Sequence, residues 1–152
     1  MVWRPGGVIT LLTDFGLKDP FVGVMKGVIL GINPEARIVD LTHDVEPHDV
    51  VQAGFLLHIA HRFFPRGTVH LAVVDPGVGG SRRPLLAVTE SYVFVGPDNG
   101  VLALAVKNQR IEHLYEISNR KLMLPKISDT FHGRDIFAPA AAHLANGTPP
   151  SE

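Results

Sequence analysis

Continuous apolar runs that alternate with helical patterns constrain the fold of this chain more than any other feature of its sequence. Residues 8–13 are expected to form a strand, because a continuous apolar run suits a strand that is buried on both faces. Residues 37–41 and 68–74 are expected to form a second and a third strand. Between these runs, apolar residues recur at helical spacing over residues 20–32 and 50–64. The alternation predicts a three-layer α/β/α domain with a largely parallel central sheet.

Residues that cap or interrupt a helix mark the limits of the two expected helices. Asp19 followed by Pro20 predicts an N-cap with proline at the first helical position, and Asn33-Pro34 is expected to end this helix. Asp49 is the expected cap of the second helix. The expected buried face of the first helix consists of Val24, Met25, Val28 and Ile32.

The second half of the chain is less regular. Residues 85–89 and 92–95 predict two strands joined by a tight turn, and residues 96–100 (GPDNG) are a dense turn signal. The remaining expected elements are a short helix, a strand and an alanine-rich helix, at residues 101–106, 111–117 and 138–145.

Composition limits the classes of protein to which the chain can belong. With 152 residues, 45% of them hydrophobic, one domain with one core is expected. A net charge of −1 without a basic run argues against nucleic acid as a partner. The absence of cysteine excludes disulfides and thiolate metal sites. No apolar run approaches the roughly 20 residues of a membrane span, and no signal peptide is recognised, so a cytoplasmic protein without membrane contact is expected.

Polar side chains follow each of the first three expected strands. Asp14 comes after the first strand, His43-Asp44 after the second and Asp75 after the third. In open α/β sheets, ligands bind at the carboxyl ends of the strands. Three strand ends that carry acids or histidine therefore predict one shared ligand pocket.

Residues 74–83 (VDPGVGGSRR) form a glycine-rich segment that matches neither a P-loop nor a dinucleotide fingerprint. Its glycines allow the backbone to turn sharply and to approach a ligand closely. Asp75 and Arg82 are seven residues apart, and the intervening loop could fold them together. The alternative is an ordinary connecting loop with a surface ion pair.

Residues 129–135 (DTFHGRD) are the other dense group of polar side chains. His132 before a glycine suggests an imidazole on a tight turn that a ligand can approach. The alternative is that Arg134 and Asp135 cap the following helix and that His132 is a structural histidine.

Four motifs occur in a fixed order along the chain: residues 13–16 (TDFG), 75–79 (DPGVG) with Arg82, 96–100 (GPDNG) and 131–135 (FHGRD). In this order they resemble the S-adenosylmethionine hydroxide adenosyltransferases, which are adenosine-forming S-adenosylmethionine hydrolases related to the fluorinases and chlorinases. The resemblance extends from about residue 8 to residue 152. It implies SN2 attack of water on the ribose 5′ carbon of S-adenosylmethionine, giving adenosine and methionine, with no cofactor and no metal.

The resemblance also implies roles for individual residues. Asp75, Arg82 and His132 match a triad that holds the attacking water. Asp14 matches the carboxylate that binds the ribose hydroxyls, and His48 matches a tryptophan on the ribose side of the fluorinase pocket. The halogenating relatives have tyrosine at the position of Asp75 and lack the arginine and histidine, so water is favoured over halide. The implied substrate-binding set is completed by Phe15, Val78, Asp98, Asn99 and Gly133.

Members of the resembled family are about twice as long as this chain and carry a second, β-barrel-like domain. They assemble as homotrimers with sites between the first domain of one subunit and the second domain of the next. Residues 1–147 are therefore expected to be the catalytic α/β domain, and residues 148–152 (TPPSE) the start of an interdomain linker. Alone, such a domain is expected to bind the nucleotide poorly.

Two other functions are consistent with the residues. The first is a metal-dependent phosphoesterase, with carboxylate and imidazole ligands, although several of these residues are also placed to cap backbone groups. Its ligands would be Asp14, His43, Asp44, His48, Asp49 and His132. The second is a non-catalytic module that binds adenosine or S-adenosylmethionine. The remaining histidines, His58, His61, His70 and His113, are expected to be structural.

Overall fold

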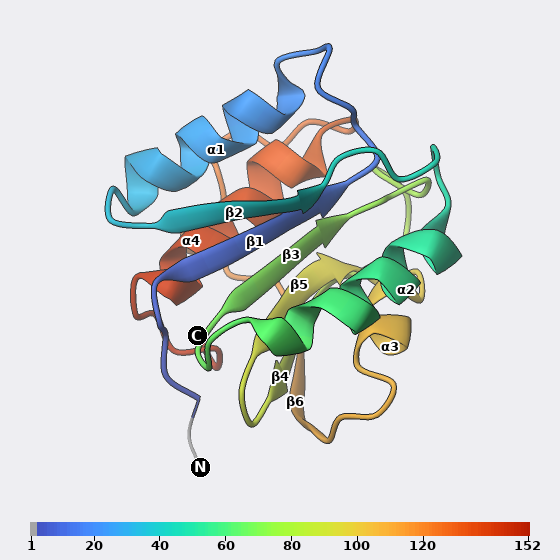
Figure 1. Cartoon of the computed structure of the whole chain (residues 1–152). Coiled ribbons are helices and arrows are strands. Elements are labelled where there is room, and N and C mark those ends of the chain that lie inside the picture. Colours follow the sequence, from blue (N-terminus) through green and yellow to red (C-terminus); the bar gives the residue numbers. More distant parts are fainter. Residues whose placement is uncertain (1–2) are drawn as a thin grey trace.

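A computed structural model describes residues 3–152 and contains one six-stranded sheet in the order β2-β1-β3-β5-β4-β6. Figure 1 shows this sheet at the centre of the domain. Only β4 runs antiparallel to its neighbours β5 and β6, so the predicted largely parallel sheet is confirmed. The strands are β1 (Val8–Thr13), β2 (Arg37–Thr42), β3 (Val69–Val73), β4 (Pro84–Thr89), β5 (Val93–Pro97) and β6 (Ile111–Glu116).

Helices cover both faces of the sheet, which confirms the predicted three layers. Helices α1 (Phe21–Ile32) and α4 (Ala138–Ala145) lie on one face, and α2 (Val50–Ala60) and α3 (Val101–Ala105) lie on the other (Figure 1). No helix within residues 3–152 is long and apolar enough to cross a bilayer. Three short helical turns complete the fold: η1 (His61–Phe63), η2 (Arg120–Leu122) and the π-helical turn η3 (Gly133–Phe137).

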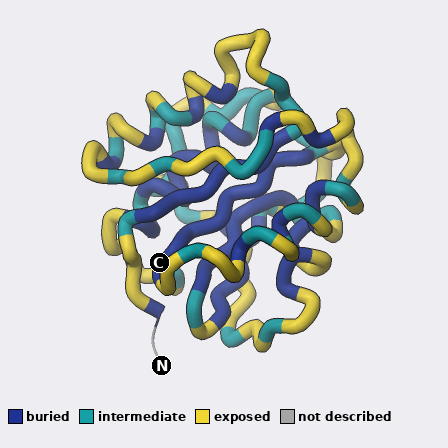
Figure 2. Tube along the Cα trace, in the orientation of Figure 1, coloured by how far each residue is buried: buried dark blue, intermediate teal, exposed yellow. Residues whose placement is uncertain are grey.

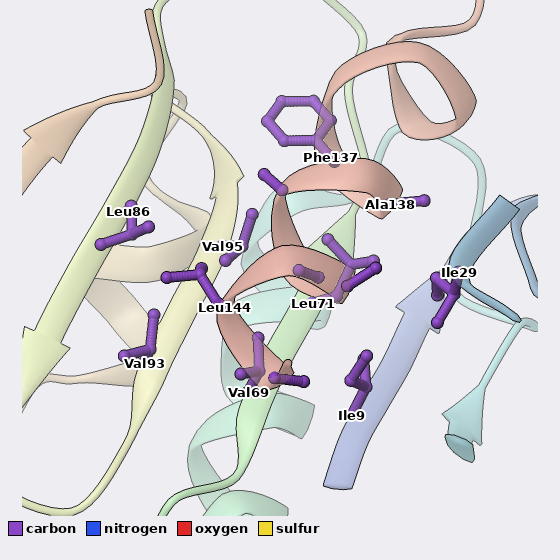
Figure 3. Close-up of a cluster of buried hydrophobic side chains, with 14 of the residues drawn as sticks. Ile9, Ile29, Val69, Leu71, Leu86, Val93, Val95, Phe137, Ala138 and Leu144 are labelled. Atoms are coloured by element: carbon purple, nitrogen blue, oxygen red, sulfur yellow. The ribbon is translucent and has the colours of Figure 1, made fainter. Parts of the chain in front are cut away.

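The core consists of two layers because each inner strand is buried on both faces. Along β3, Val69 and Leu71 belong to the cluster that packs against α1 and α4, whereas Ala72 belongs to the cluster beneath α2 and α3. Figure 3 shows Val69 and Leu71 beside Leu144 of α4 in the first cluster. This two-sided burial explains the continuous apolar runs of the sequence. Figure 2 shows the inner strands as buried, whereas β2 at the edge of the sheet is largely exposed or half-buried.

The start of α1 differs from the prediction. The helix begins at Phe21 with Pro20 as its N-cap residue, and Asp19 does not provide the expected cap. Met25 is buried as expected, but Val24 is exposed. Apolar residues surround most of this helix, so their spacing alone does not select the buried face. The structure selects Val22, Met25 and Ile29, with Val28 and Ile32 partly buried beside them.

Other local predictions are confirmed. Asp49 caps α2, because its carboxylate accepts a hydrogen bond of 2.9 Å from the backbone N–H of Gln52. The predicted pair of strands in the second half is the antiparallel hairpin of β4 and β5. Strand β5 extends to Pro97, so the turn before α3 is shorter than its sequence suggested and ends at Gly100, whose φ is 96°.

Candidate active site

A pocket of about 290 Å³ lies where β1 and β3 end. The carboxyl ends of parallel strands meet at this edge of the sheet, as ligand sites in α/β domains require. Loops that follow β1, β2 and β3 line the pocket together with the start of η3. The lining residues are Asp14, Phe15, Pro47, His48, Val73, Asp75, Val78, Thr130, Phe131, His132 and Gly133.

Arg82 joins Asp75 and His132 beside this pocket. Its Nε donates to the two carboxylate oxygens of Asp75 at 2.9 and 3.1 Å, and its Nη2 donates to Oδ2 of the same carboxylate. The same Nη2 lies 2.8 Å from Nδ1 of His132. The three side chains that the sequence placed far apart therefore form one hydrogen-bonded group.

The surroundings of this group strengthen the pairing of its charges. The side chains of Arg82 and Asp75 are only 9% and 5% exposed, so both charges are largely removed from water. The guanidinium carbon of Arg82 also lies 5.3 Å from the ring centre of Phe137, which is fully buried. Removal of either charge would leave the other buried without a partner, which is strongly destabilising.

The direction of the bond between Arg82 and His132 determines the imidazole tautomer. A guanidinium has only donor groups, so Nδ1 of His132 must be the acceptor. In the neutral ring the proton is then on Nε2. His132 can therefore donate a hydrogen bond from Nε2 to a molecule in the pocket.

The topology of the sheet explains how these residues meet. Asp75 follows β3, whereas Arg82 precedes β4. Because β4 is antiparallel, its first residue lies at the edge where β3 ends. His132 is the N-cap residue of η3, and this position brings it to the same edge of the sheet.

Asp14 lies directly after β1 and faces the same pocket. One of its carboxylate oxygens, Oδ2, accepts a hydrogen bond of 2.8 Å from the backbone N–H of His48. His48 has a φ of 65°, in the left-handed region that residues other than glycine rarely adopt. Strain of this kind at a pocket residue is typical of functional sites.

Two phenylalanine rings line the pocket, Phe15 and Phe131, and a third, Phe21, packs against both of them. From the sequence, only Phe15 was assigned a binding role. The rings of Phe15 and Phe131, which both line the pocket, meet edge to face with centroids 5.8 Å apart. Phe21 contacts Phe131 in the same way at 5.1 Å. Two features of the sequence could have indicated these rings. Phe131 belongs to the FHGRD motif, and Phe21 opens α1 directly after the loop that carries Phe15.

Asp98 and Asn99 do not line this pocket. Asp98 pairs with Arg83 at the surface, at 2.8 Å. The side-chain amide of Asn99 donates to the carbonyl of Val74 at 2.8 Å, and its oxygen accepts from the N–H of Val101. Asn99 thus links the start of α3 to the backbone just before Asp75.

The structure also separates residues that the sequence expected in one pocket. His43 is buried behind the pocket, where its ring bonds Thr13 and Asp40, and Asp44 is exposed and does not line the pocket. Among residues 3–152, no three His, Asp or Glu side chains gather closely enough to hold a metal ion. The ligand set of the phosphoesterase alternative therefore does not converge.

A larger cavity of about 400 Å³ lies at the opposite end of the sheet, beside the end of β4. Two of its polar side chains bond backbone carbonyls of the protein itself. His58 lies 3.1 Å from the carbonyl of Ala105, and Tyr92 donates to the carbonyl of Phe64 at 2.7 Å. The pocket of about 290 Å³ is the better candidate of the two, because carboxylates and imidazoles line it together.

The fold and the pocket define a three-layer α/β domain with an Asp–Arg–His group beside a pocket at the edge where β1 and β3 end. Residues 9–152 match the model of the S-adenosylmethionine hydroxide adenosyltransferase N-terminal domain, and the chain belongs to this family.

Similar proteins agree with this assignment. An (R)-S-adenosyl-L-methionine hydrolase of Thermus thermophilus is 46% identical, over 93% of this chain and 58% of the relative. A fluorinase of an Actinoplanes species is 30% identical, over 95% of this chain and 56% of the relative. An uncharacterized conserved protein from Thermotoga maritima has a TM-score of 0.92 at 50% identity, over 94% of this chain and 56% of that one. The chain spans about half the length of the curated relatives it matches.

Proposed function

We propose that this protein hydrolyses S-adenosylmethionine to adenosine and methionine by SN2 attack of water on the ribose 5′ carbon. The observation that carries the proposal is the hydrogen-bonded group of Asp75, Arg82 and His132 beside a pocket that also contains Asp14. The family assignment and the names of the similar hydrolases support it.

The chemistry of the substrate explains why such a group is sufficient. The sulfonium leaves as a neutral thioether, so the leaving group needs no general acid. Water is a weak nucleophile and must approach the carbon opposite the sulfur. Fixing it in line with that bond lowers the barrier by about 7–11 kcal/mol in favourable cases.

The hydrogen bonds support different tasks for Asp75 and His132 in the proposed reaction, with Arg82 bonded to both. Asp75 is a carboxylate that retains acceptor capacity beside Arg82, so it accepts a proton of the water. His132, whose Nδ1 is occupied by Arg82, donates from Nε2 to the water oxygen and orients it. Removal of the proton by a positioned base contributes about 10²–10⁴-fold to the rate.

Asp14 binds the substrate rather than the water in this proposal. Its carboxylate accepts hydrogen bonds from the two ribose hydroxyls, while Phe15 and Phe131 supply apolar walls to the pocket. His48 contributes its backbone N–H, which holds one oxygen of Asp14, and a side chain beside the ribose. Val78 and Gly133 complete the wall near the water.

Isotope labelling tests the reaction directly. The complete protein as the cell makes it, and this chain in parallel, are incubated with S-adenosylmethionine in oxygen-18 water. Adenosine that carries one heavy oxygen supports attack of water at the 5′ carbon. Adenosine without the label, or turnover that a chelator abolishes, would contradict the mechanism. Tight binding without turnover by the complete protein would indicate a non-catalytic binding module.

The resemblance to the family supports further parts of the proposal. The reaction uses no cofactor, and the active unit is a cytoplasmic homotrimer in which a second domain, joined through residues 148–152, completes the site above residues 1–147. No nucleic acid or membrane takes part. Light scattering of the complete protein, with a mass other than three subunits, would contradict the trimer.

A further inference from the structure

A second group of polar side chains lies behind the candidate active site and has no part in the proposed reaction. Nε2 of His43 lies 2.8 Å from Oδ1 of Asp40, and its Nδ1 lies 2.8 Å from the hydroxyl of Thr13. These residues come from β2, from the corner after it and from the end of β1. The pairing of β1 with β2 shifts in register here, since Leu11 pairs with Asp40 and Leu12 with Thr42.

The hydrogen bonds of this group have a single consistent direction. Asp40 also accepts from Lys26 at 2.6 Å; burial raises its pKa, but bonds from Lys26 and His43 outweigh burial and hold the pKa below 3.8. Asp40 is therefore an acceptor, and Nε2 of His43 carries the proton that it donates. Nδ1 of the neutral ring then accepts from the hydroxyl of Thr13.

The hydroxyl of Thr13 in turn holds the loop that carries Asp14. Its oxygen accepts from the backbone N–H of Phe15 at 3.2 Å. The backbone carbonyl of His43 accepts from the N–H of Gly16 at 2.7 Å. His43 thus holds both sides of the turn after β1, once through its ring and once through its backbone.

An acid, an imidazole and a hydroxyl in series resemble a nucleophilic triad, but burial excludes that role. Thr13 has no exposed surface and His43 is 4% exposed, and neither lines the pocket. A substrate carbon therefore cannot reach the hydroxyl in this structure.

We propose that Asp40, His43 and Thr13 are positioning residues, whose relay of hydrogen bonds fixes the turn at Asp14 and directs its carboxylate toward the ligand. The inference rests on the proposed function for the role of Asp14 as the ribose-binding acid. The existence of the relay itself does not depend on that function.

The chain offers a matched control on the same strand. The hydroxyl of Thr10, which is also fully buried, lies 2.6 Å from Nδ1 of His70 and so makes the same kind of pair. His70 lies on β3, away from the turn at Asp14. Thr10→Val and Thr13→Val therefore remove equivalent hydroxyls, but only the second removes a contact to the Asp14 turn.

The first measurement needs no ligand. The N–H of His48 donates to Asp14, so its NMR resonance reports the position of that carboxylate. We expect Thr13→Val to shift the resonances of Phe15 and His48, Thr13→Ser to restore them, and Thr10→Val to leave them in place. Nitrogen NMR of the wild-type protein should show the proton of His43 on Nε2. A proton on Nδ1 of neutral His43, or an unchanged His48 resonance in Thr13→Val, would overturn the relay.

The second measurement is the kinetics of the complete protein. Thr13→Val should loosen the position of Asp14 and so weaken its bonds to the ribose hydroxyls. We expect KM to rise about tenfold with little change in kcat, because binding of the ground state and of the transition state is weakened alike. Thr13→Ser should recover the wild-type KM, and Thr10→Val should match it. An equal rise in KM for Thr10→Val would overturn the positioning role. If the wild-type protein forms no adenosine, the proposed function fails, and the NMR result still decides the relay.

Discussion

The backbone of Gly79 packs against the carbonyl oxygen of Asp129, so that a Cβ on Gly79 would overlap that oxygen. Gly79 lies in the loop between Asp75 and Arg82, and Asp129 lies in the loop that leads to His132. Gly79 also has a φ of 76°, which favours glycine. The convergence of the three candidate catalytic residues therefore depends on a contact between two backbones.

Replacement of this glycine should separate the two loops. We expect Gly79→Ala to lower the free energy of unfolding by about 1–3 kcal/mol, from backbone strain and overlap, and to abolish most adenosine formation. Chemical denaturation and a chromatographic assay measure the two effects. Gly23→Ala is the control, because Gly23 lies in α1 with open space around it, and it should be neutral or slightly stabilising. Full activity of Gly79→Ala would contradict the prediction.

Arg82 should tolerate no substitution that removes its planar group. Arg82→Lys keeps the charge but cannot bond Asp75 twice and His132 at once, so we expect the rate to fall by about 10²–10³-fold. The measurement is adenosine formation at saturating substrate. Its neighbour provides the comparison: Arg83 pairs with Asp98 at the surface, and Arg83→Lys should retain wild-type activity. Equal rates for the two variants would argue against a catalytic role for Arg82.

Asp135 should stabilise the loop that leads to His132. Its buried carboxylate accepts bonds from the N–H and the hydroxyl of Ser128 at 2.8 and 2.7 Å, and Arg134 donates to it at 2.7 Å. Burial raises the pKa of Asp135, but these bonds outweigh burial and hold the pKa below 3.8. We expect Asp135→Ala to lower the free energy of unfolding by about 1–3 kcal/mol at neutral pH.

The pH dependence of this effect has a defined sign. Because the folded pKa is lowered, the carboxylate of Asp135 contributes stability above pH 3.8 and loses it as the pH falls through and below that value. The difference in the free energy of unfolding between wild type and Asp135→Ala should therefore become smaller at acidic pH. Denaturation curves at neutral and acidic pH provide the measurement, with Asp129→Asn, an exposed neighbour, as the control. A constant difference would contradict the assignment.

His70 should make the fold sensitive to mild acid. Burial lowers the pKa of His70 from 6.5 to about 3, and Nε2 of its ring has no hydrogen-bond partner. The unfolded chain takes up a proton below pH 6.5 that the folded chain excludes. The free energy of unfolding should therefore fall between pH 6.5 and 3, by up to about 1.4 kcal/mol per pH unit.

A double substitution isolates this contribution. His70→Phe combined with Thr10→Val removes both members of the buried pair and should flatten the decline in stability between pH 6.5 and 3. Part of the pH dependence of stability should remain in the double variant, because burial also lowers the pKa values of His61 and His143. An identical slope in both proteins would show that His70 is not the source.

The sequence predicted the layers and the strands because burial on both faces leaves an unbroken apolar run, as in β1 and β3. It predicted the buried face of α1 only in part: Met25 is buried as expected, but Val24 is exposed. The helix has apolar residues on several sides, so packing against α4 and the sheet selects the buried ones. The π-helical turn η3 was also missed, because no residue type marks a turn of this kind.

For the site, the strand ends indicated Asp14 and Asp75 correctly as neighbours, because parallel strands bring their carboxyl ends together. Spacing left two interpretations of Asp75 and Arg82 open, and the bond to His132 came only from the structure. His43 was assigned to the pocket for the same reason as Asp14, yet its ring turns back toward Thr13. Position after a strand identifies the edge, but hydrogen-bond partners decide which way a side chain faces.

The reversed direction of β4 has a consequence for how the site could be altered. Asp75 lies where the chain leaves β3, and Arg82 lies just before the chain enters β4. A single loop of eight residues, 75–82, therefore carries both members of the ion pair. Asp14, the proposed ribose-binding acid, follows a different strand, β1, and is held separately by the backbone N–H of His48. The ion pair can therefore be altered by changes within residues 75–82 alone, whereas an exchange of the proposed nucleophile would also involve His132, which lies outside this loop.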